Sequence, residues 1–311
     1  MYKQLLKEAQ LRISPYIHNT PVLTSGLLNK ISGAHLFFKC ENFQRMGAFK
    51  MRGALNALLQ LSDAQKAKGV ITHSSGNFAQ AIALAAKSLG IKAYIVMPKN
   101  APDNKKGAVL GYGGEIIESE STPIAREQLA NKVMQDTGAI FIHPSNNKHV
   151  IIGQGTAALE LLESYPDLDI VITPVGGGGL LAGAALATHY FGKNCKIIAG
   201  EPIEANDAFR SLKSGKIETN ITTNTIADGL RTQFGSNNFP IIKNYVDKII
   251  CVSELEIIEA MKLIWERLKI VVEPSSAVAF AAILQKKKNF KDKNIGVILS
   301  GGNVDLTHLP F

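Results

Sequence analysis

Runs of mostly apolar residues alternate along the chain with segments whose apolar residues follow a helical spacing. Runs of the first kind are typical of strands that are buried on both faces of a sheet. In the first half of the chain they occupy residues 34–41, 69–74, 91–98, 115–119 and 139–144. Helices are expected between them, at residues 51–61, 77–90, 103–113 and 122–138. This alternation predicts a parallel sheet with helices packed on it.

The second half of the chain continues the alternation after residue 145. Strands are expected at residues 169–175, 195–202, 248–253 and 294–300, and helices at 156–165, 180–191, 275–285 and around Trp265. Residues 211–240 are polar and show little periodicity. No linker separates the two series, so we expect an α/β protein with two open, twisted parallel sheets and a cleft between them. Residues 50–145 would form the smaller domain, and residues 1–49 and 146–311 the larger one.

The composition is that of an ordinary globular protein. Of the 311 residues, 46% are hydrophobic and 19% are charged. The longest apolar runs, such as residues 277–284, are far shorter than the roughly 20 residues of a membrane span. Residues 1–13 contain no apolar signal-peptide segment. We therefore expect a cytoplasmic protein with no membrane partner.

The formal net charge of +8 raises the question of nucleic acid binding. The most basic segment, residues 286–293, has a single aromatic residue, Phe290, and not the series of interleaved aromatic residues that stack on bases. We interpret it as a solvated helix end and loop, and expect no nucleic acid partner. A mildly basic surface also suits an enzyme that acts on small anionic molecules.

Four consecutive glycines, Gly176, Gly177, Gly178 and Gly179, lie between a predicted buried strand and a predicted helix. A tight turn requires only one glycine, whereas four allow the backbone to approach a phosphate group at the helix N-terminus. The segment also matches the loose dinucleotide-binding pattern Gly-x-Gly-x-x-Ala, and Glu201 ends the next strand, where a ribose-binding acid would lie. A nicotinamide-dependent oxidoreductase is therefore an alternative at this point.

Lys50 lies among small and apolar residues at the start of a predicted helix. It is either a surface lysine with a buried stem or a desolvated amine with a lowered pKa, which suits a Schiff base. Residues 74–77 (Ser-Ser-Gly-Asn) and 300–303 (Ser-Gly-Gly-Asn) each end a predicted strand with small hydrogen-bonding groups. Because ligands bind at the carboxyl ends of parallel strands, we expect Lys50, both segments and the glycine run to form one site. Such a site suits an aldehyde cofactor with a phosphate group.

At the level of longer motifs, the sequence resembles the fold type II pyridoxal-phosphate enzymes, and specifically the serine racemase and serine/threonine dehydratase family. The resemblance extends from about residue 3 to residue 309. Its motifs are ENFQRMGAFKMRGALNAL, THSSGN, NAPDNKK, GQGTAALE, PVGGGGLLAG, AGEPIEAND, TIADGL, VEPSSAVAFAA and LSGGNVDL. It implies a fold like that of the tryptophan synthase β subunit, with pyridoxal 5′-phosphate held by the larger domain, a mobile smaller domain and a homodimer.

The resemblance also implies a role for each candidate residue. Lys50 would bind the cofactor and remove the Cα proton of the substrate, and Phe49 would pack against the cofactor ring. The four glycines would hold the phosphate, Asn77 the ring hydroxyl and Ser300 the pyridine nitrogen. The residues implied in binding the substrate carboxylate are Ser74, Ser75, Gly76 and Asn77.

Three further positions match the divalent-cation site of the family. They are Glu201, the carbonyl of Ala205, and Asp207. Oxygen ligands in an irregular loop suit Mg²⁺ or Ca²⁺. The alternative is an acidic loop that is merely solvated.

A neutral hydroxyl at Ser300 would leave the pyridine nitrogen unprotonated, which favours prompt β-elimination. We therefore predict that the protein converts L-serine or L-threonine to a 2-oxo acid and ammonia. Ser75 is the candidate acid on the face of the substrate opposite Lys50, so serine racemisation is expected as a side activity. Racemisation as the main activity, dehydration of 3-hydroxyaspartate and a ligand sensor without catalysis are the alternatives.

Two places depart from the family pattern. Phe78 replaces the histidine that is usual after Ser-Gly-Asn, and residues 143–147 (His-Pro-Ser-Asn-Asn) match the common pattern of neither the racemases nor the dehydratases. Both departures leave the substrate open. We expect Arg126 to be solvated on its helix and His73 to be structural.

Overall fold

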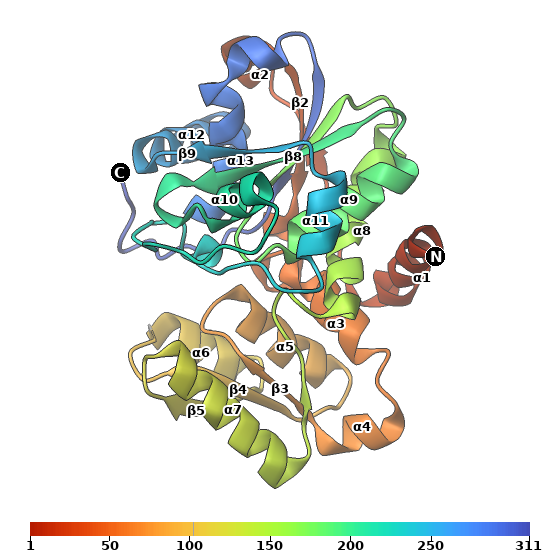
Figure 1. Cartoon of the computed structure of the whole chain (residues 1–311), viewed down its shortest axis with the longest axis vertical. Helices are drawn as coiled ribbons and strands as arrows, with labels where there is room; N and C mark the ends of the chain where they lie inside the picture. The colour runs from red at the N-terminus through yellow and green to blue at the C-terminus, as the bar shows by residue number, and fades with distance from the viewer. Residues whose placement is uncertain (102) are drawn as a thin grey trace.

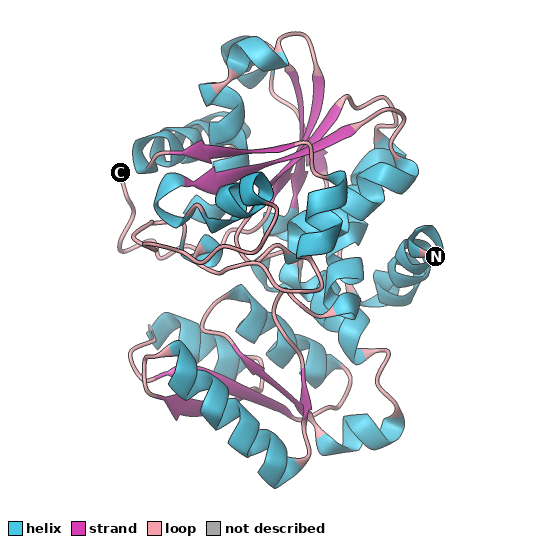
Figure 2. Ribbon diagram, viewed as in Figure 1, coloured by secondary structure: helices cyan, strands magenta, loops and turns pink. Residues whose placement is uncertain are grey.

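The computed structural model describes residues 1–101 and 103–311, and within them a larger and a smaller sheet are covered by helices (Figure 1 and Figure 2). The larger sheet has the order β1-β2-β10-β7-β8-β9, in which β1 is antiparallel to β2 and the other neighbours are parallel. Its strands are β1 (Val22–Leu23), β2 (His35–Cys40), β7 (Ile170–Pro174), β8 (Lys196–Pro202), β9 (Lys248–Val252) and β10 (Asn294–Leu299). The smaller sheet has the parallel order β5-β4-β3-β6, with strands β3 (Val70–His73), β4 (Ala93–Pro98), β5 (Glu115–Ser119) and β6 (Ile140–Phe141). The predicted α/β class with parallel sheets is confirmed.

Helices cover both faces of the larger sheet. On one face, a shared apolar core holds α1 (Tyr2–Ile13), α8 (Lys148–Ser164), α9 (Gly179–Phe191) and α11 (Phe239–Tyr245). On the other face, a second core holds α2 (Gly26–Ser32), α12 (Glu254–Leu268) and α13 (Pro274–Gln285). Burial from both sides explains why strands such as β10 are apolar at nearly every position.

The smaller sheet is covered in the same way. On one side lie α3 (Lys50–Leu58), α5 (Asn77–Ser88) and α6 (Asp103–Gly111). On the other side, α7 (Pro123–Thr137) packs against Ile71 and Val96. A short helix, α4 (Asp63–Lys68), precedes β3. No helix in the described part of the chain is long and apolar enough to cross a membrane.

Helix α3 joins the two halves of the molecule, because it packs against α8 as well as against α5 (Figure 1). Glycines allow α3 and α8 to cross closely. A Cβ atom on Gly153 would lie 2.7 Å from the carbonyl oxygen of Arg52, and one on Gly53 would lie 2.8 Å from that of Val150. The helix that begins with Lys50 is therefore held by direct backbone contact with its neighbour.

The predicted strands agree with the structure to within one or two residues, except that only Ile140–Phe141 pair within residues 139–144. Helix α8 begins at Lys148, well before the predicted residue 156. The reason is a cap: Oδ1 of Asn147 accepts hydrogen bonds from the N–H groups of His149 and Val150. The polar residues 211–240 were expected to lack periodic structure, but they contain the end of α10 (Asp207–Ser214) and the start of α11.

Candidate active site

Hydrogen bonds join three of the predicted segments at the carboxyl ends of the strands. The N–H of Phe49 donates to the carbonyl of Ser300 (3.0 Å), and both residues are buried. The side-chain amide of Asn303 donates to Oδ1 of Asn77 (2.9 Å). The segment of Lys50 and the two strand-end turns therefore meet in the structure.

The glycine run joins this group through residues 143–147, which connect β6 to α8. Nζ of Lys50 lies 3.4 Å from the carbonyl oxygen of Pro144. The next residue, Ser145, packs against the run, since a Cβ atom on Gly177 would lie 2.7 Å from its Oγ. The four segments that the sequence predicts to share a site are thus connected: the linker contacts Lys50 and the glycine run, and the segment of Lys50 contacts the strand-end turn of residues 300–303, which in turn contacts residues 74–77.

Lys50 begins α3 with its amine among apolar groups. Nζ lies 4.9 Å from the ring centroid of Phe49 and 5.7 Å from that of Phe78. Burial lowers the pKa of Lys50 from 10.5 to about 8, and the nearby carboxylate of Glu273 opposes part of this shift. At neutral pH, a much larger fraction of this amine is unprotonated than for an exposed lysine, as a nucleophile or proton acceptor requires.

Glu273, which the sequence analysis did not single out, lies next to Asn77. Nδ2 of Asn77 donates to both carboxylate oxygens of Glu273, each at 3.0 Å. Only 4% of Glu273 is exposed, and burial raises its pKa from 4.5 to about 7. The signal available in the sequence was that Glu273 is the single charged residue of the segment 270–283.

The turn between β3 and α5 presents polar groups to open space. Oγ of Ser74 accepts a hydrogen bond from the N–H of Gly76 (3.3 Å). A Cβ atom on Gly76 would meet no other atom within 4 Å. The hydroxyl of Ser75 makes no hydrogen bond to any described residue. The turn therefore has room and donors for a small anionic group.

The glycine run is tightly enclosed and has unused donors. A Cβ atom on Gly176 would lie 2.6 Å from Cα of Leu230, and one on Gly178, whose φ is 79°, would lie 2.7 Å from the ring of Phe234. Among the residues that the structure describes, the N–H groups of Gly176, Gly177 and Gly178 have no hydrogen-bond acceptor. Free backbone donors at the start of α9 fit a phosphate group.

The candidate cation ligands lie between the end of β8 and the start of α10. Glu201 accepts hydrogen bonds from the N–H groups of Ala208 and Phe209, each at 2.8 Å. Glu201, Ala205 and Asp207 are all buried. Burial raises the pKa of Glu201 to about 8 and that of Asp207 to about 6. Buried acids of this kind fit a bound cation.

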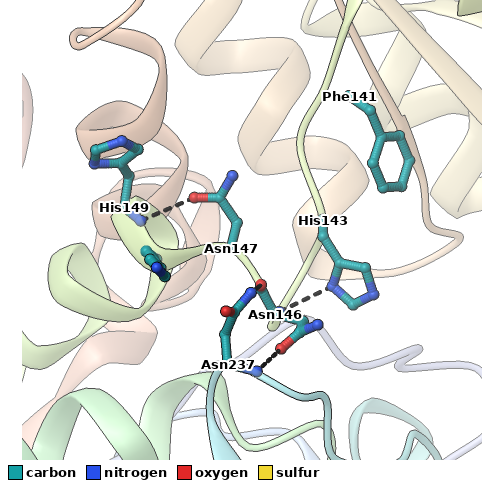
Figure 3. A pocket seen from close by; sticks show the side chains of 7 residues that line it. Phe141, His143, Asn146, Asn147, His149 and Asn237 are labelled. Atoms are coloured by element: carbon teal, nitrogen blue, oxygen red, sulfur yellow. Dashed lines mark hydrogen bonds between the residues drawn. The ribbon is translucent and has the colours of Figure 1, made fainter.

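A pocket of about 360 Å³ borders the linker of residues 143–147 (Figure 3). It is lined by Phe141, His143, Asn146, Asn147, Lys148, His149 and Asn237. Nδ1 of His143 accepts hydrogen bonds from the N–H groups of Ser145 and Asn146, so the neutral ring carries its proton on Nε2. Burial lowers the pKa of His143 to about 4, and the charges of His73 and Lys50 add to this shift.

Two residues without an expected role lie near the site. The ring of His73 is 5.9 Å from that of His143, in an edge-to-face contact. Arg126, which was expected to be solvated, is only partly exposed to solvent. Its Nε has no partner among the described residues. Its charge also lowers the pKa of His73, after the larger effect of burial.

Known proteins resemble this chain in sequence and in structure. The sequence model of a family described as pyridoxal-phosphate dependent enzyme matches residues 13–301. Serine racemase of Arabidopsis thaliana is 54% identical over 98% of this chain and 93% of its own length. The β-hydroxyaspartate dehydratase of Paracoccus denitrificans is 49% identical over 100% of this chain and 98% of its own length. The crystal structure of serine racemase from Dictyostelium discoideum has a TM-score of 0.93 and 50% identity, and the match covers 97% of this chain and 98% of that one.

Proposed function

Since the chain belongs to the family of pyridoxal-phosphate dependent enzymes, we propose that it is a serine racemase that also eliminates water from serine. The observation that carries this proposal is the 54% identity, over 98% of this chain, with a relative named serine racemase. The sequence motifs favoured elimination as the main activity and racemisation as a side activity, whereas the names of the relatives favour the reverse order. Lys50 and Ser75 support it as candidate proton carriers.

The site fits pyridoxal 5′-phosphate. The unpaired backbone donors of the glycine run suit its phosphate, and the desolvated amine of Lys50 suits its aldehyde. Phe49 would flank the ring, Asn77 would hydrogen-bond the ring hydroxyl and Ser300 would face the pyridine nitrogen. When bound, the cofactor supplies an electron-withdrawing ring that makes the Cα proton of an amino acid removable.

In this proposal, the side chains of the protein divide the proton transfers between two faces of the substrate. Lys50, with a pKa near 8, accepts and returns the Cα proton on one face. A single amine returns the proton only to the face from which it came, so inversion needs a second carrier. Ser75 is the candidate on the opposite face. Ser74 and Gly76 would hold the substrate carboxylate where the turn borders open space.

A second candidate function is the dehydration of 3-hydroxyaspartate. It is favoured by the 49% identity, over the whole chain, with a relative named β-hydroxyaspartate dehydratase. Phe78 and residues 143–147 border Lys50 and depart from the common family patterns. These are therefore the positions at which a preference between the two substrates would arise.

A substrate panel tests both candidates. Chiral chromatography measures D-serine formed from L-serine, and coupled assays measure 2-oxo acid and ammonia from both enantiomers of serine, threonine and 3-hydroxyaspartate. We expect D-serine to form from L-serine faster than pyruvate does. Faster turnover of 3-hydroxyaspartate than of serine would favour the second candidate, and no turnover of any substrate would indicate a ligand sensor.

The cofactor is tested by its colour. We expect a yellow protein that borohydride bleaches, with the modification on Lys50. A colourless protein that binds NAD would support the nicotinamide alternative instead. In that alternative, Glu201 would bind the ribose of NAD. Both carboxylate oxygens of Glu201, however, already accept hydrogen bonds from backbone N–H groups.

Three finer features of the family are part of the proposal. A Mg²⁺ or Ca²⁺ ion would be bound by Glu201, the Ala205 carbonyl and Asp207, which is supported by the burial of both acids. Residues 50–145 would form the smaller domain, because all four strands of the smaller sheet lie in this range, and this domain would be mobile. The protein would be a homodimer, which light scattering in solution would detect.

A further inference from the structure

The side chain of Asn238 connects three segments around the glycine run. Asn238 is fully buried and directly precedes α11. Its Nδ2 donates to the carbonyl of Gly177 (2.7 Å) and to that of Ser145 (3.1 Å), and its Oδ1 accepts from the N–H of Gly235 (3.0 Å). The donors and the acceptor of this amide are thus all engaged with backbone groups.

The bond to Gly177 determines where the next backbone donor points. Across a trans peptide, the carbonyl oxygen of one residue and the N–H of the next point in opposite directions. Anchoring the Gly177 carbonyl on Asn238 therefore turns the N–H of Gly178 away from Asn238. No described residue accepts a hydrogen bond from that N–H, so it is available to an anion.

The bond to Ser145 connects the same amide to the surroundings of Lys50. Ser145 lies in the linker between β6 and α8, and the carbonyl of the preceding Pro144 lies 3.4 Å from Nζ of Lys50. Because Asn238 binds the linker and the glycine run at once, it sets their separation. The same separation fixes the distance between Nζ of Lys50, which would bind the aldehyde of the cofactor, and the backbone N–H groups of the glycine run, which would bind its phosphate.

We propose that Asn238 is a positioning residue for the phosphate group of the cofactor. By holding the Gly177 carbonyl, it aims the backbone donors of the glycine run at the phosphate, and it makes no contribution to the binding of the cofactor ring. The inference rests on the proposed pyridoxal-phosphate site. It predicts that Asn238 affects the binding of ligands that carry a phosphate and not of those that lack one.

The neighbouring Asn237 provides a matched control. Its Nδ2 donates to the carbonyl of Asn146 (2.6 Å), and its N–H donates to Oδ1 of Asn146 (2.7 Å) (Figure 3). Asn237 therefore binds the same linker, but among the described residues it has no hydrogen bond to the glycine run. Asn237→Leu and Asn238→Leu remove the same amide at adjacent positions, and only the second frees the Gly177 carbonyl.

The experiment compares three probes on the full chain after removal of the cofactor: pyridoxal 5′-phosphate, pyridoxal and inorganic phosphate. Absorbance titration measures the affinity for the two aldehydes, and thermal unfolding measures stabilisation by phosphate. In Asn238→Leu, the affinity for pyridoxal 5′-phosphate should fall about tenfold or more, as expected when a buried hydrogen bond is lost, while the affinity for pyridoxal stays unchanged. Inorganic phosphate should raise the unfolding temperature of the wild type and of Asn237→Leu, but not that of Asn238→Leu.

Equal losses of affinity for both aldehydes in Asn238→Leu would overturn the inference, as would stabilisation by phosphate equal to that of the wild type. If Asn238→Leu does not fold, Asn238→Ser decides by the same measurements, because its short hydroxyl cannot reach both carbonyls. Formation of D-serine is measured separately. A wild type that binds the cofactor without racemising serine would refute the proposed racemase function and leave the comparison of the three probes valid.

Discussion

The side-chain amide of Asn77 donates to both carboxylate oxygens of Glu273, at 3.0 Å each, although the two residues are 196 positions apart in the chain. On its other side, Oδ1 of Asn77 accepts a hydrogen bond from Asn303 (2.9 Å). The amide that would face the cofactor is therefore fixed at both ends. The carboxylate of Glu273 also raises the pKa of Lys50, against the larger effect of burial. Protonation of Glu273 therefore changes the charge next to both Asn77 and Lys50.

The free energy of unfolding should depend on pH through Glu273. Burial raises its pKa from 4.5 to about 7; Asp228 adds to the shift, and Asn77 and Lys105 oppose it. The folded protein therefore binds this proton more tightly than the unfolded chain does. The resulting stabilisation is complete below pH 4.5 and is lost as the pH rises through about 7. Glu273→Gln is neutral throughout and lacks this dependence.

Urea unfolding of the cofactor-free wild type and of Glu273→Gln, between about pH 4.5 and about pH 8, measures this difference. The wild type should lose stability relative to the variant as the pH rises across this range. Groups that do not interact with Glu273 contribute equally in both proteins, so they cancel in the comparison. A difference that stays constant with pH would contradict the raised pKa of Glu273.

Ser75→Ala should abolish the formation of D-serine from L-serine, because no second proton carrier would remain on the face opposite Lys50. The formation of pyruvate should stay largely intact, since Lys50 alone removes the Cα proton for elimination. Ser74→Ala is the control. Its hydroxyl accepts from the N–H of Gly76, so its loss loosens the turn and should raise KM for both reactions alike. D-serine produced by Ser75→Ala at the wild-type rate would rule out the two-carrier assignment.

Addition of Mg²⁺ or Ca²⁺ should raise the unfolding temperature of the wild type, and a chelator should lower it, because an ion that binds only the folded chain stabilises it. Asp207→Asn should remove most of this response, since a neutral amide is a weaker ligand for a hard cation. Glu204→Gln, in the same loop, should keep it. Differential scanning fluorimetry measures the shift, and a wild type that responds to neither ion would contradict the proposed site.

Arg52 forms a buried charge network that holds α3. It makes paired hydrogen bonds to Glu41 (2.7 and 2.9 Å) and to Glu160 (both 2.7 Å), and Glu160 also accepts from Lys39 (2.7 Å). Although burial alone would raise the pKa of Glu41, the guanidinium of Arg52 lowers it. The negative charges of two glutamates are therefore compensated by the positive charges of Arg52 and Lys39, beside the helix that begins with Lys50.

Arg52→Met should lower the free energy of unfolding by about 3–5 kcal/mol, because it leaves the buried carboxylate of Glu41 and the partly buried one of Glu160 with one lysine. Lys7→Met, which breaks a more exposed ion pair with Glu163, should change it by less than about 1 kcal/mol. Urea unfolding measures both variants at one pH. If Arg52→Met cost no more stability than Lys7→Met, the network would not stabilise the fold.

The amino-acid sequence by itself determined the elements whose pattern is local. Buried parallel strands are apolar at consecutive positions, so β7 (Ile170–Pro174) was predicted within residues 169–175. Helix α7 was predicted with both its ends, because Thr122 caps its start and Gly138, at a φ of 71°, ends it. The rule that ligands bind at the carboxyl ends of parallel strands was sufficient to predict that Lys50 and the glycine run lie in one region.

Only the tertiary structure decided which polar residues complete the site. Glu273 and Asn238 have hydrogen-bond partners far away in the chain, so no local period distinguishes them from other polar residues. The raised pKa of Glu273 and the lowered pKa of Lys50 exist only when packed segments exclude water from both. A local pattern indicates that a residue is buried. The groups that satisfy a buried polar side chain are set by whichever distant segments enclose it, and that is a property of the packed fold.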